Sequence, residues 1–157
     1  MLSHVEHVKD WHVIVLSERL READKAEIKA ISGLPPLRGL IESVSLSSVS
    51  YSIMEEGIPV AMYGARKTQE DLGLVWMLAS EAIERNTFQF LRKSVEYIDA
   101  LHDEVGCAVL TNLIDKRNTL HHKWVKWIGF SMGKEEPHGP YGLPFYRITR
   151  IRKSCAG

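Results

Sequence analysis

Hydrophobic and polar positions along the chain recur with two different periods, which divide it into helices and strands. Apolar residues spaced three to four apart predict helices, and short β-branched or alternating runs predict strands. In the first half these patterns predict a strand over 12–16, helices over 18–31 and 35–46, and a hairpin with strands over 49–54 and 58–65. The helix over 18–31 has its apolar repeat at Leu20, Ala23, Ala26 or Glu27, and Ala30 or Ile31.

The second half begins with residues 73–79, a nearly continuous apolar run that is typical of a central strand covered on both faces. Further along, the patterns predict a helix over 86–104, a strand over 107–113, a helix over 118–128, a strand starting at 130–132, a loop over 135–143 and a strand over 145–151. This alternation predicts one α/β domain with a mixed sheet and helices on both of its faces. The ends, 1–11 and 152–157, are predicted to be flexible.

Composition and charge limit the classes of function. The 157 residues are 45% hydrophobic and 25% charged, with a formal net charge of zero, as expected for one soluble globular domain. Neutrality argues against broad electrostatic binding to nucleic acid or to anionic membranes. The two cysteines, Cys107 and Cys155, do not indicate a disulfide framework, so a reducing cytosol is expected. We see no apolar signal region and no apolar run of membrane-spanning length.

The segment 118–130, NTLHHKWVKWIGF, is compatible with a metal site, a nucleic-acid platform or a packed helix. On a helix, one apolar stripe is formed by Leu120, Trp124, Trp127 and Ile128. This arrangement favours core packing over base stacking. Adjacent side chains such as His121 and His122 diverge by about 100° on a helix, so they cannot hold one ion together. No other histidine or cysteine shows metal-ligand spacing, and we predict no metal site.

The order of elements around this segment carries a resemblance. A strand ending near Asn112, then Asn118, then a helix ending in Gly129-Phe130 resembles the closing segment of GCN5-related N-acetyltransferases (GNAT). The element order over about 12–151 is similar as well. The resemblance implies a single GNAT-like α/β (α+β) domain over 1–157. Its mixed, mostly antiparallel central sheet would have about six to seven strands, with about four helices on both faces.

Three segments resemble a narrower family. Residues 75–92 (VWMLASEAIERNTFQFLR), 118–130 and 139–148 (GPYGLPFYRI) are similar, in this order, to GNAT-like proteins of short-tailed phages that encode their own RNA polymerase. One branch of that family is described as internal virion protein A. The resemblance implies a protein of the phage virion or of the host cell cytoplasm. Its partners would be other phage virion proteins or a host protein.

GNAT chemistry implies a cradle for the pyrophosphate of acetyl-CoA and a splayed strand for its pantetheine arm. The cradle segment, 79–90, contains no glycine, and its Glu81 and Glu84 would repel phosphate, with Arg85 compensating in part. By position, the residues that would bind acetyl-CoA are Leu78, Ala79, Ser80, Arg85, Asn86, Thr87, Asn112 and Asn118. The missing glycines argue against orthodox cofactor binding.

The chemistry also needs a general acid for the departing thiolate. The family often uses a tyrosine on the last helix, and counting back from Gly129 places Val125 there, with Trp124 beside it. His121 or His122 could substitute, because imidazole titrates in the useful range, and Glu81 could act as a base.

A Pro/Gly-rich loop near the C-terminus is a separate candidate site. Tyrosine and phenylalanine are frequent interface anchors. The candidate partner-docking residues are His138, Tyr141, Phe145 and Tyr146. The alternative is a plain connection between the last two strands.

Two hypotheses of function follow from these features. In the first, the chain is a phage virion-associated or accessory protein with a degenerate acetyl-CoA site and no cofactor, which acts through protein contacts. In the second, it is an active N-acyltransferase that uses acetyl-CoA to modify a host or phage target. A DNA-contacting role is a third, disfavoured by the neutral charge.

Overall fold

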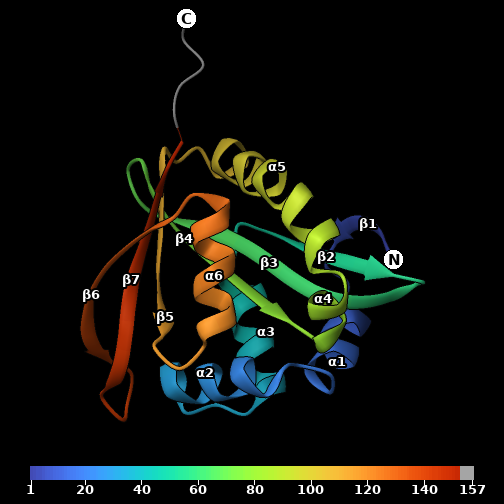
Figure 1. Ribbon diagram of the computed structural model, residues 1–157, viewed down its shortest axis with the longest axis horizontal. Coiled ribbons are helices and arrows are strands. Elements are labelled where there is room, and N and C mark those ends of the chain that lie inside the picture. The colour runs from blue at the N-terminus through green and yellow to red at the C-terminus, as the bar shows by residue number, and fades with distance from the viewer. Residues whose placement is uncertain (153–157) are drawn as a thin grey trace, which may run out of the picture.

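A seven-stranded mixed sheet forms the centre of the computed structural model, which describes residues 1–152 (Figure 1). The strands are β1 (Leu2–His7), β2 (Val49–Glu55), β3 (Ile58–Gln69), β4 (Leu72–Ala79), β5 (Val109–Asp115), β6 (Ser131–His138) and β7 (Leu143–Ile151). They lie in the order β1-β2-β3-β4-β5-β7-β6, and every neighbouring pair is antiparallel except β4 and β5. The predicted α/β domain with a mixed, mostly antiparallel sheet is confirmed.

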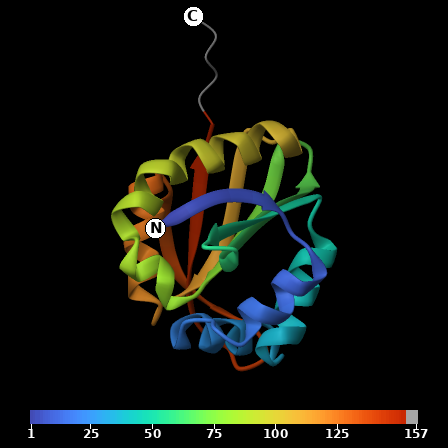
Figure 2. The ribbon, with the colours of Figure 1, turned by 90° about the vertical axis from the view of Figure 1, so that its right-hand side faces the viewer.

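Six helices cover the two faces of the sheet, rather than the four or so that were predicted. They are α1 (Asp10–Ser17), α2 (Glu22–Ser32), α3 (Pro36–Leu46), α4 (Glu81–Arg85), α5 (Thr87–Val105) and α6 (Thr119–Ile128). Helices α1 to α3, blue to cyan in Figure 2, lie together on one side, and α5 lies on the other. No helix within residues 1–152 is long and apolar enough to cross a membrane.

Each face of the sheet has its own apolar core, because successive side chains of a strand point to opposite faces. Tyr63 of β3 belongs to the larger core under α4, α5 and α6, where Phe90 and Trp124 meet edge to face at 5.4 Å. Its neighbour Met62 belongs to the second core, with Leu16 and other residues of α1 to α3. The sheet is therefore buried on both faces, as its central apolar strand indicates.

β4 and β5 separate soon after they begin. Their parallel pairing covers only three residue pairs: Leu72 with Val109, Gly73 with Leu110, and Leu74 with Thr111. Just beyond these pairs, the side-chain amide of Asn112 donates a hydrogen bond to the carbonyl oxygen of Val75 at 2.5 Å. The two strands then diverge towards their C-terminal ends. This divergence opens a gap in the middle of the sheet.

The predicted strand over 12–16 is wrong, because these residues belong to helix α1. The helix buries His12, Val13 and Leu16 and leaves Ile14 exposed. Its first turn is held by the ring of His12, whose Nδ1 accepts a hydrogen bond from the Lys9 backbone N–H at 3.1 Å. The predicted helix over 18–31 is correspondingly shorter at its start, since α1 ends at Ser17 and α2 begins at Glu22.

The N-terminal residues are not the flexible end that was predicted. β1 pairs with β2 at one edge of the sheet. The side-chain amide of Gln89, on α5, holds this strand from above: its oxygen accepts the N–H of Leu2 at 3.0 Å, and its nitrogen donates to the Leu2 carbonyl at 2.8 Å. At the other end, the N–H of Arg152 donates to Ala108 at 2.7 Å. The remainder of the predicted C-terminal tail, including Cys155, lies outside the described residues.

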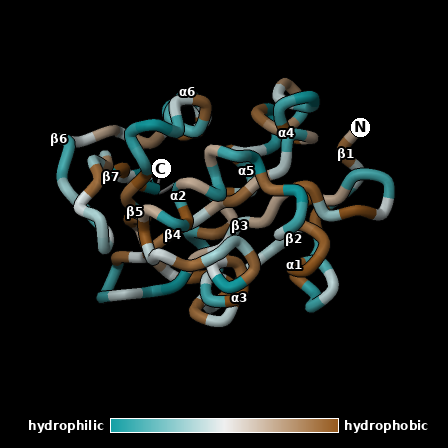
Figure 3. Tube along the Cα trace, turned by 90° about the horizontal axis from the view of Figure 1, so that it is seen from below, coloured by the Kyte–Doolittle hydropathy of each residue, from teal (hydrophilic) through white to brown (hydrophobic). Residues whose placement is uncertain are grey.

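Most of the predicted loop over 135–143 is strand. β6 runs to His138, and only residues 139–142 turn before β7 begins. β6 is one of the two edge strands of the sheet, so Pro137 can lie in it without breaking a central ladder. Figure 3 shows this edge as mostly hydrophilic. Lys116 and Arg147 form ion pairs with Glu135 and Glu136 there.

Candidate functional site: a gap in the sheet bridged by helix α2

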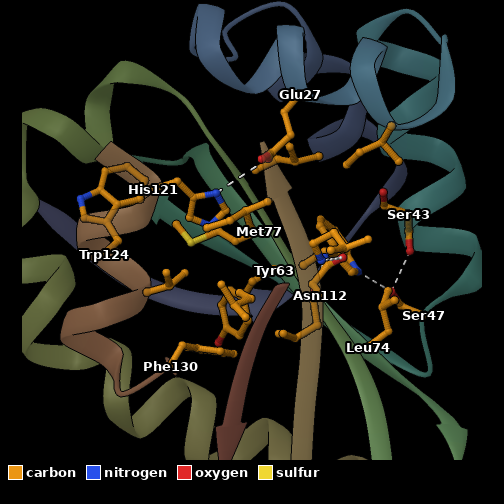
Figure 4. A pocket seen from close by; sticks show the side chains of 18 of the residues that line it. Glu27, Ser43, Ser47, Tyr63, Leu74, Met77, Asn112, His121, Trp124 and Phe130 are labelled. Atoms are coloured by element: carbon orange, nitrogen blue, oxygen red, sulfur yellow. Dashed lines mark hydrogen bonds and ion pairs between the residues drawn. The ribbon is translucent and has the colours of Figure 1, made fainter. Parts of the chain in front are cut away.

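A cavity of about 300 Å³ passes through the gap between β4 and β5 (Figure 4). Met77 and Asn112 lie in the gap itself, Trp124 and Phe130 line the α5 and α6 side, and Ser43 lines the α3 side. Most of the wall is apolar, with a few polar groups among the lining residues. Such a mixture is typical of small-molecule sites in proteins.

The C-terminal mouth of the gap is bridged by side chains of the α2 segment. Asp24, only 2% exposed, accepts the backbone N–H of Ala79 on Oδ2 at 2.9 Å and the side-chain amide of Asn118 on Oδ1 at 2.8 Å. The carbonyl of Ala79 accepts the backbone N–H of Arg21 at 2.9 Å. We call Arg21, Asp24 and Glu27 the α2 plug, because they join the free edges of β4 and β5.

Arg21 neutralises much of the charge in the α2 plug. Its guanidinium donates to Asp24 at 3.2 Å, to Glu84 at 2.7 Å and to the side-chain oxygen of Asn118 at 3.3 Å. The same group lies over the ring of Trp124, 4.9 Å from its centre. Arg21 is buried, so these contacts hold it in one place between α2 and α6.

Glu27 bridges to β5 and to α6. Its Oε1 accepts the backbone N–H of Asp115 at 2.6 Å, and its Oε2 lies 3.7 Å from Nδ1 of His121 (Figure 4). Burial by itself would lower the pKa of His121, but the carboxylates of Glu27 and Asp24 outweigh it and raise that pKa above its usual value. Burial, assisted by the charge of Glu27, raises the pKa of Asp24 against the effects of His121 and Arg21.

The candidate pyrophosphate segment forms a short helix instead of a glycine loop. Ser80 begins α4, and its hydroxyl accepts the N–H of Ala82 at 3.3 Å. A second pocket of about 330 Å³ lies beside it, and its charged lining residues are three carboxylates and two guanidiniums, from Glu55, Glu56, Glu81, Arg19 and Arg85. Acidic groups outnumber basic ones on this surface, which makes it less favourable to a phosphate than a glycine-rich loop would be.

The remaining candidate cofactor residues are already engaged. Asn86 donates to Glu55 at 2.6 Å and to the Ala82 carbonyl at 2.8 Å, and Thr87 donates to the Glu84 carbonyl at 2.7 Å. Leu78 is buried in the core beneath α1 to α3. Of the predicted set, Ala79 and Asn118 are joined through Asp24, Leu78 and Asn112 line the cavity in the gap, and Ser80 and Arg85 line the second pocket.

Of the three candidate catalytic residues, only His121 lines the cavity. It is buried, not exposed as a helix histidine often is. His122 instead hydrogen-bonds to the carbonyl of Asp115 at 2.8 Å, and Glu81 lines the second pocket. Val125 also lines the cavity, at the position where the resemblance places a tyrosine.

Tyr63 is a cavity residue that sequence reasoning missed. It comes from β3, and its ring stacks on that of Tyr97 with centres 5.7 Å apart. Burial raises the pKa of Tyr63 well above its ordinary value. A raised pKa makes the Tyr63 hydroxyl a weaker proton donor than an ordinary tyrosine.

The predicted docking residues at the C-terminal turn differ in how far they are exposed to solvent. Phe145 is fully buried in a small cluster with Ala30 and Leu113, so it anchors the turn and is not available to a partner. His138 packs edge-on against Phe145, and Tyr146 packs against His122. Tyr141 is 56% exposed and is the member of the predicted set that faces solvent most fully.

Sequence comparison finds no matching family profile and no matching curated protein. The fold, however, is similar to solved acetyltransferases. The aminoglycoside acetyltransferase AAC(6')-Ib, in complex with ribostamycin and coenzyme A, matches over 94% of this chain and 92% of its own, with 15% identity and a TM-score of 0.70. Ard1 from Thermoplasma volcanium matches over 96% and 98%, with 11% identity and a TM-score of 0.74.

A GNAT-family acetyltransferase from Bacillus anthracis matches over 96% of this chain and 98% of its own, with 11% identity and a TM-score of 0.68. At such identities the similarity establishes the fold alone. The chain has the fold of the GNAT acetyltransferases, over nearly its whole length.

Proposed function

We propose that this chain is a GNAT-fold protein that acts through protein contacts and does not bind acetyl-CoA in the manner of the family. Its resemblance to GNAT-like phage proteins supports a role as a virion-associated or accessory protein, in the phage virion or the host cytoplasm. Other phage virion proteins or a host protein would be its partners. The observation that carries the proposal is the position of Asp24 in the gap of the sheet.

Asp24 occupies hydrogen-bonding groups that a cofactor would need. The resemblance places Ala79 and Asn118 among the residues that would bind acetyl-CoA, and Asp24 accepts a hydrogen bond from each of them. Pantetheine could pair with Ala79 only if Asp24 gave up this hydrogen bond. A hydrogen bond to a charged group typically contributes about 1.5–3 kcal/mol, which the binding of the cofactor would have to offset.

The positions expected to bind the pyrophosphate and to supply the general acid also do not suit acetyl-CoA. The segment beside Ser80 offers no glycine backbone to the pyrophosphate, and the pocket there has an excess of carboxylates. In the cavity, Val125 has no proton to donate to a thiolate, and Tyr63 is a weaker proton donor than an ordinary tyrosine. We therefore derive no acyl-transfer step from this site.

An active N-acyltransferase is the second candidate, and two observations favour it. The gap between β4 and β5 is open below the α2 plug, where Met77 lines the cavity. His121 also faces this cavity beside a carboxylate, as a general base would. In this case a partner or substrate would have to displace Asp24 before acetyl-CoA could enter.

Calorimetric titration with acetyl-CoA and with free CoA separates the two candidates. We expect no heat and no thermal shift up to millimolar ligand, with AAC(6')-Ib as the positive control. A ligand present at 100 times its dissociation constant would add about 2.7 kcal/mol to stability, which is readily measured. Micromolar binding by the wild-type chain would contradict the proposal.

The variant Asp24→Ala identifies which feature excludes the cofactor. If the α2 plug alone blocks the path, the folded variant should bind CoA where the wild type does not. If the folded variant also shows no CoA binding in the titration, the glycine-free segment is sufficient to prevent binding. The virion role is tested separately by mass spectrometry of purified particles of the phage that carries this chain. Presence at a fixed copy number supports the proposal, and absence from both particles and infected-cell complexes refutes it.

A further inference from the structure

Three buried side chains from two helices converge at the inner side of the α2 plug. Asp24 and Glu27 lie three residues apart, and therefore on one face of α2, and His121 faces them from α6. One ligand atom from each of the three lies within 4.8 Å of the others. All three residues are buried, so water does not satisfy them freely.

The ring of His121 is the second observation that points to a ligand. Its side chain is 9% exposed, and its Nδ1 has no hydrogen-bond partner among the described residues. The nearest carboxylate oxygen, Oε2 of Glu27, lies at 3.7 Å, which is beyond hydrogen-bond range. Two atoms that each bind one zinc ion at about 2.0–2.2 Å in a tetrahedron are roughly 3.4 Å apart. The observed 3.7 Å is closer to that value than to the length of an N–H···O hydrogen bond, about 2.7–3.2 Å.

The carboxylates retain the capacity to bind an ion. A carboxylate has about four acceptor sites. Asp24 uses three of them, for Ala79, Asn118 and Arg21. Glu27 uses one, on Oε1, for the N–H of Asp115, and its Oε2 is directed at His121.

We propose that Asp24, Glu27 and His121 form a binding site for a divalent transition-metal ion, best suited to Zn²⁺. Imidazole nitrogen and carboxylate oxygen are both zinc ligands, and three protein ligands would leave a fourth position open to solvent or ligand. Imidazole disfavours Mg²⁺ and Ca²⁺, which prefer oxygen ligands alone. Glu27 and His121 both line the cavity, which provides an entry path and space for a fourth ligand.

The charges of the cluster favour a cation. Arg21 is shared between Asp24 and Glu84, so Asp24 and Glu27 together retain an excess of negative charge that a divalent ion would offset. This inference is independent of the proposed lack of CoA binding, and a metal would reinforce the link between α2 and α6.

Calorimetry on chelator-stripped protein tests the site, with ZnCl₂ as titrant and MgCl₂ as comparator. We expect one zinc ion per chain with submicromolar affinity and no response to magnesium. Co²⁺ should give the intense visible absorption of a tetrahedral ion. Glu27→Gln keeps the acceptor for Asp115, and we expect it to weaken zinc binding by at least about tenfold, as losses around metal sites commonly do. His121→Gln should act similarly.

Two matched variants distinguish this cluster from zinc bound elsewhere on the protein. Glu84→Gln removes a carboxylate that also contacts Arg21 but lies outside the cluster, and it should leave zinc affinity unchanged. His4→Gln removes an exposed imidazole that could bind zinc adventitiously. The proposal fails if the wild type binds no zinc, or if Glu27→Gln binds it as well as wild type does. If the cluster variants do not fold, zinc-edge diffraction from wild-type crystals decides, and a peak elsewhere or nowhere overturns the site.

Discussion

Replacing Arg21 with alanine is expected to lower the free energy of unfolding by about 3–5 kcal/mol, the usual cost of removing one partner from a buried ion pair. The substitution leaves Asp24 buried without its cation and Asn118 without a donor to its side-chain oxygen. It also removes the stacking of the guanidinium on Trp124. Urea unfolding followed by fluorescence and by circular dichroism measures the change.

Two variants make this result specific. Lys25→Ala removes an exposed ion pair with Glu22 on the same helix, and we expect a loss of at most about 1 kcal/mol. Arg21→Lys keeps the charge but cannot donate to three acceptors from one plane, so it should recover only part of the loss. An Arg21→Ala protein as stable as Lys25→Ala would mean that the α2 plug does not hold the mouth of the gap together.

The long periodic elements were predictable because local pattern and tertiary role agree in them. The helix predicted over 86–104 is α5 (Thr87–Val105), and the one over 118–128 is α6 (Thr119–Ile128). Trp124 is in the core, as its stripe indicates, while Trp127 on the same stripe is exposed. One turn further along α6, Trp127 lies at the rim, where its indole N–H donates to the Leu91 carbonyl at 3.2 Å. The apolar stripe predicts which way a side chain points. It does not predict how far the elements packed against the helix extend, and that decides whether the side chain is buried.

Helix α1 shows where the pattern is insufficient. Its apolar run over 12–16 is too short to separate a buried helix from a strand by period. In the structure β1 pairs with β2 at the edge of the sheet, so no strand over 12–16 is needed there. The sequence analysis did not predict β1, because its sequence, LSHVEH, has few apolar residues, as suits an exposed edge strand.

Only part of the candidate site could be predicted from the sequence. Ala79 and Asn118 follow from the resemblance, but nothing in their own segments reveals that Asp24 binds both. One signal was available: Glu27 falls on the apolar repeat of its predicted helix, and a carboxylate on a buried stripe needs partners. Those partners, on β5 and α6, are far away in the chain, so only the fold could supply them.

Gly139→Ala is expected to destabilise the protein by roughly 2–5 kcal/mol, because two costs apply at this position. Its φ of +77° lies in the left-handed region, where a Cβ costs about 1–2 kcal/mol. A Cβ here would also stand 1.9 Å from the carbonyl oxygen of Ala30, so backbone must move, at a typical overpacking cost of about 1–3 kcal/mol. Urea unfolding measures the sum.

Gly142→Ala in the same turn separates the two costs. Gly142 also has a positive φ, of +61°, but a Cβ on it would meet nothing within 4 Å. We therefore expect it to lose only the left-handed cost of about 1–2 kcal/mol. Equal losses in the two variants would show that the turn does not press on Ala30. A larger loss in Gly139→Ala would show that the β6–β7 turn lies tightly against the C-terminal turn of α2, where Ala30 is.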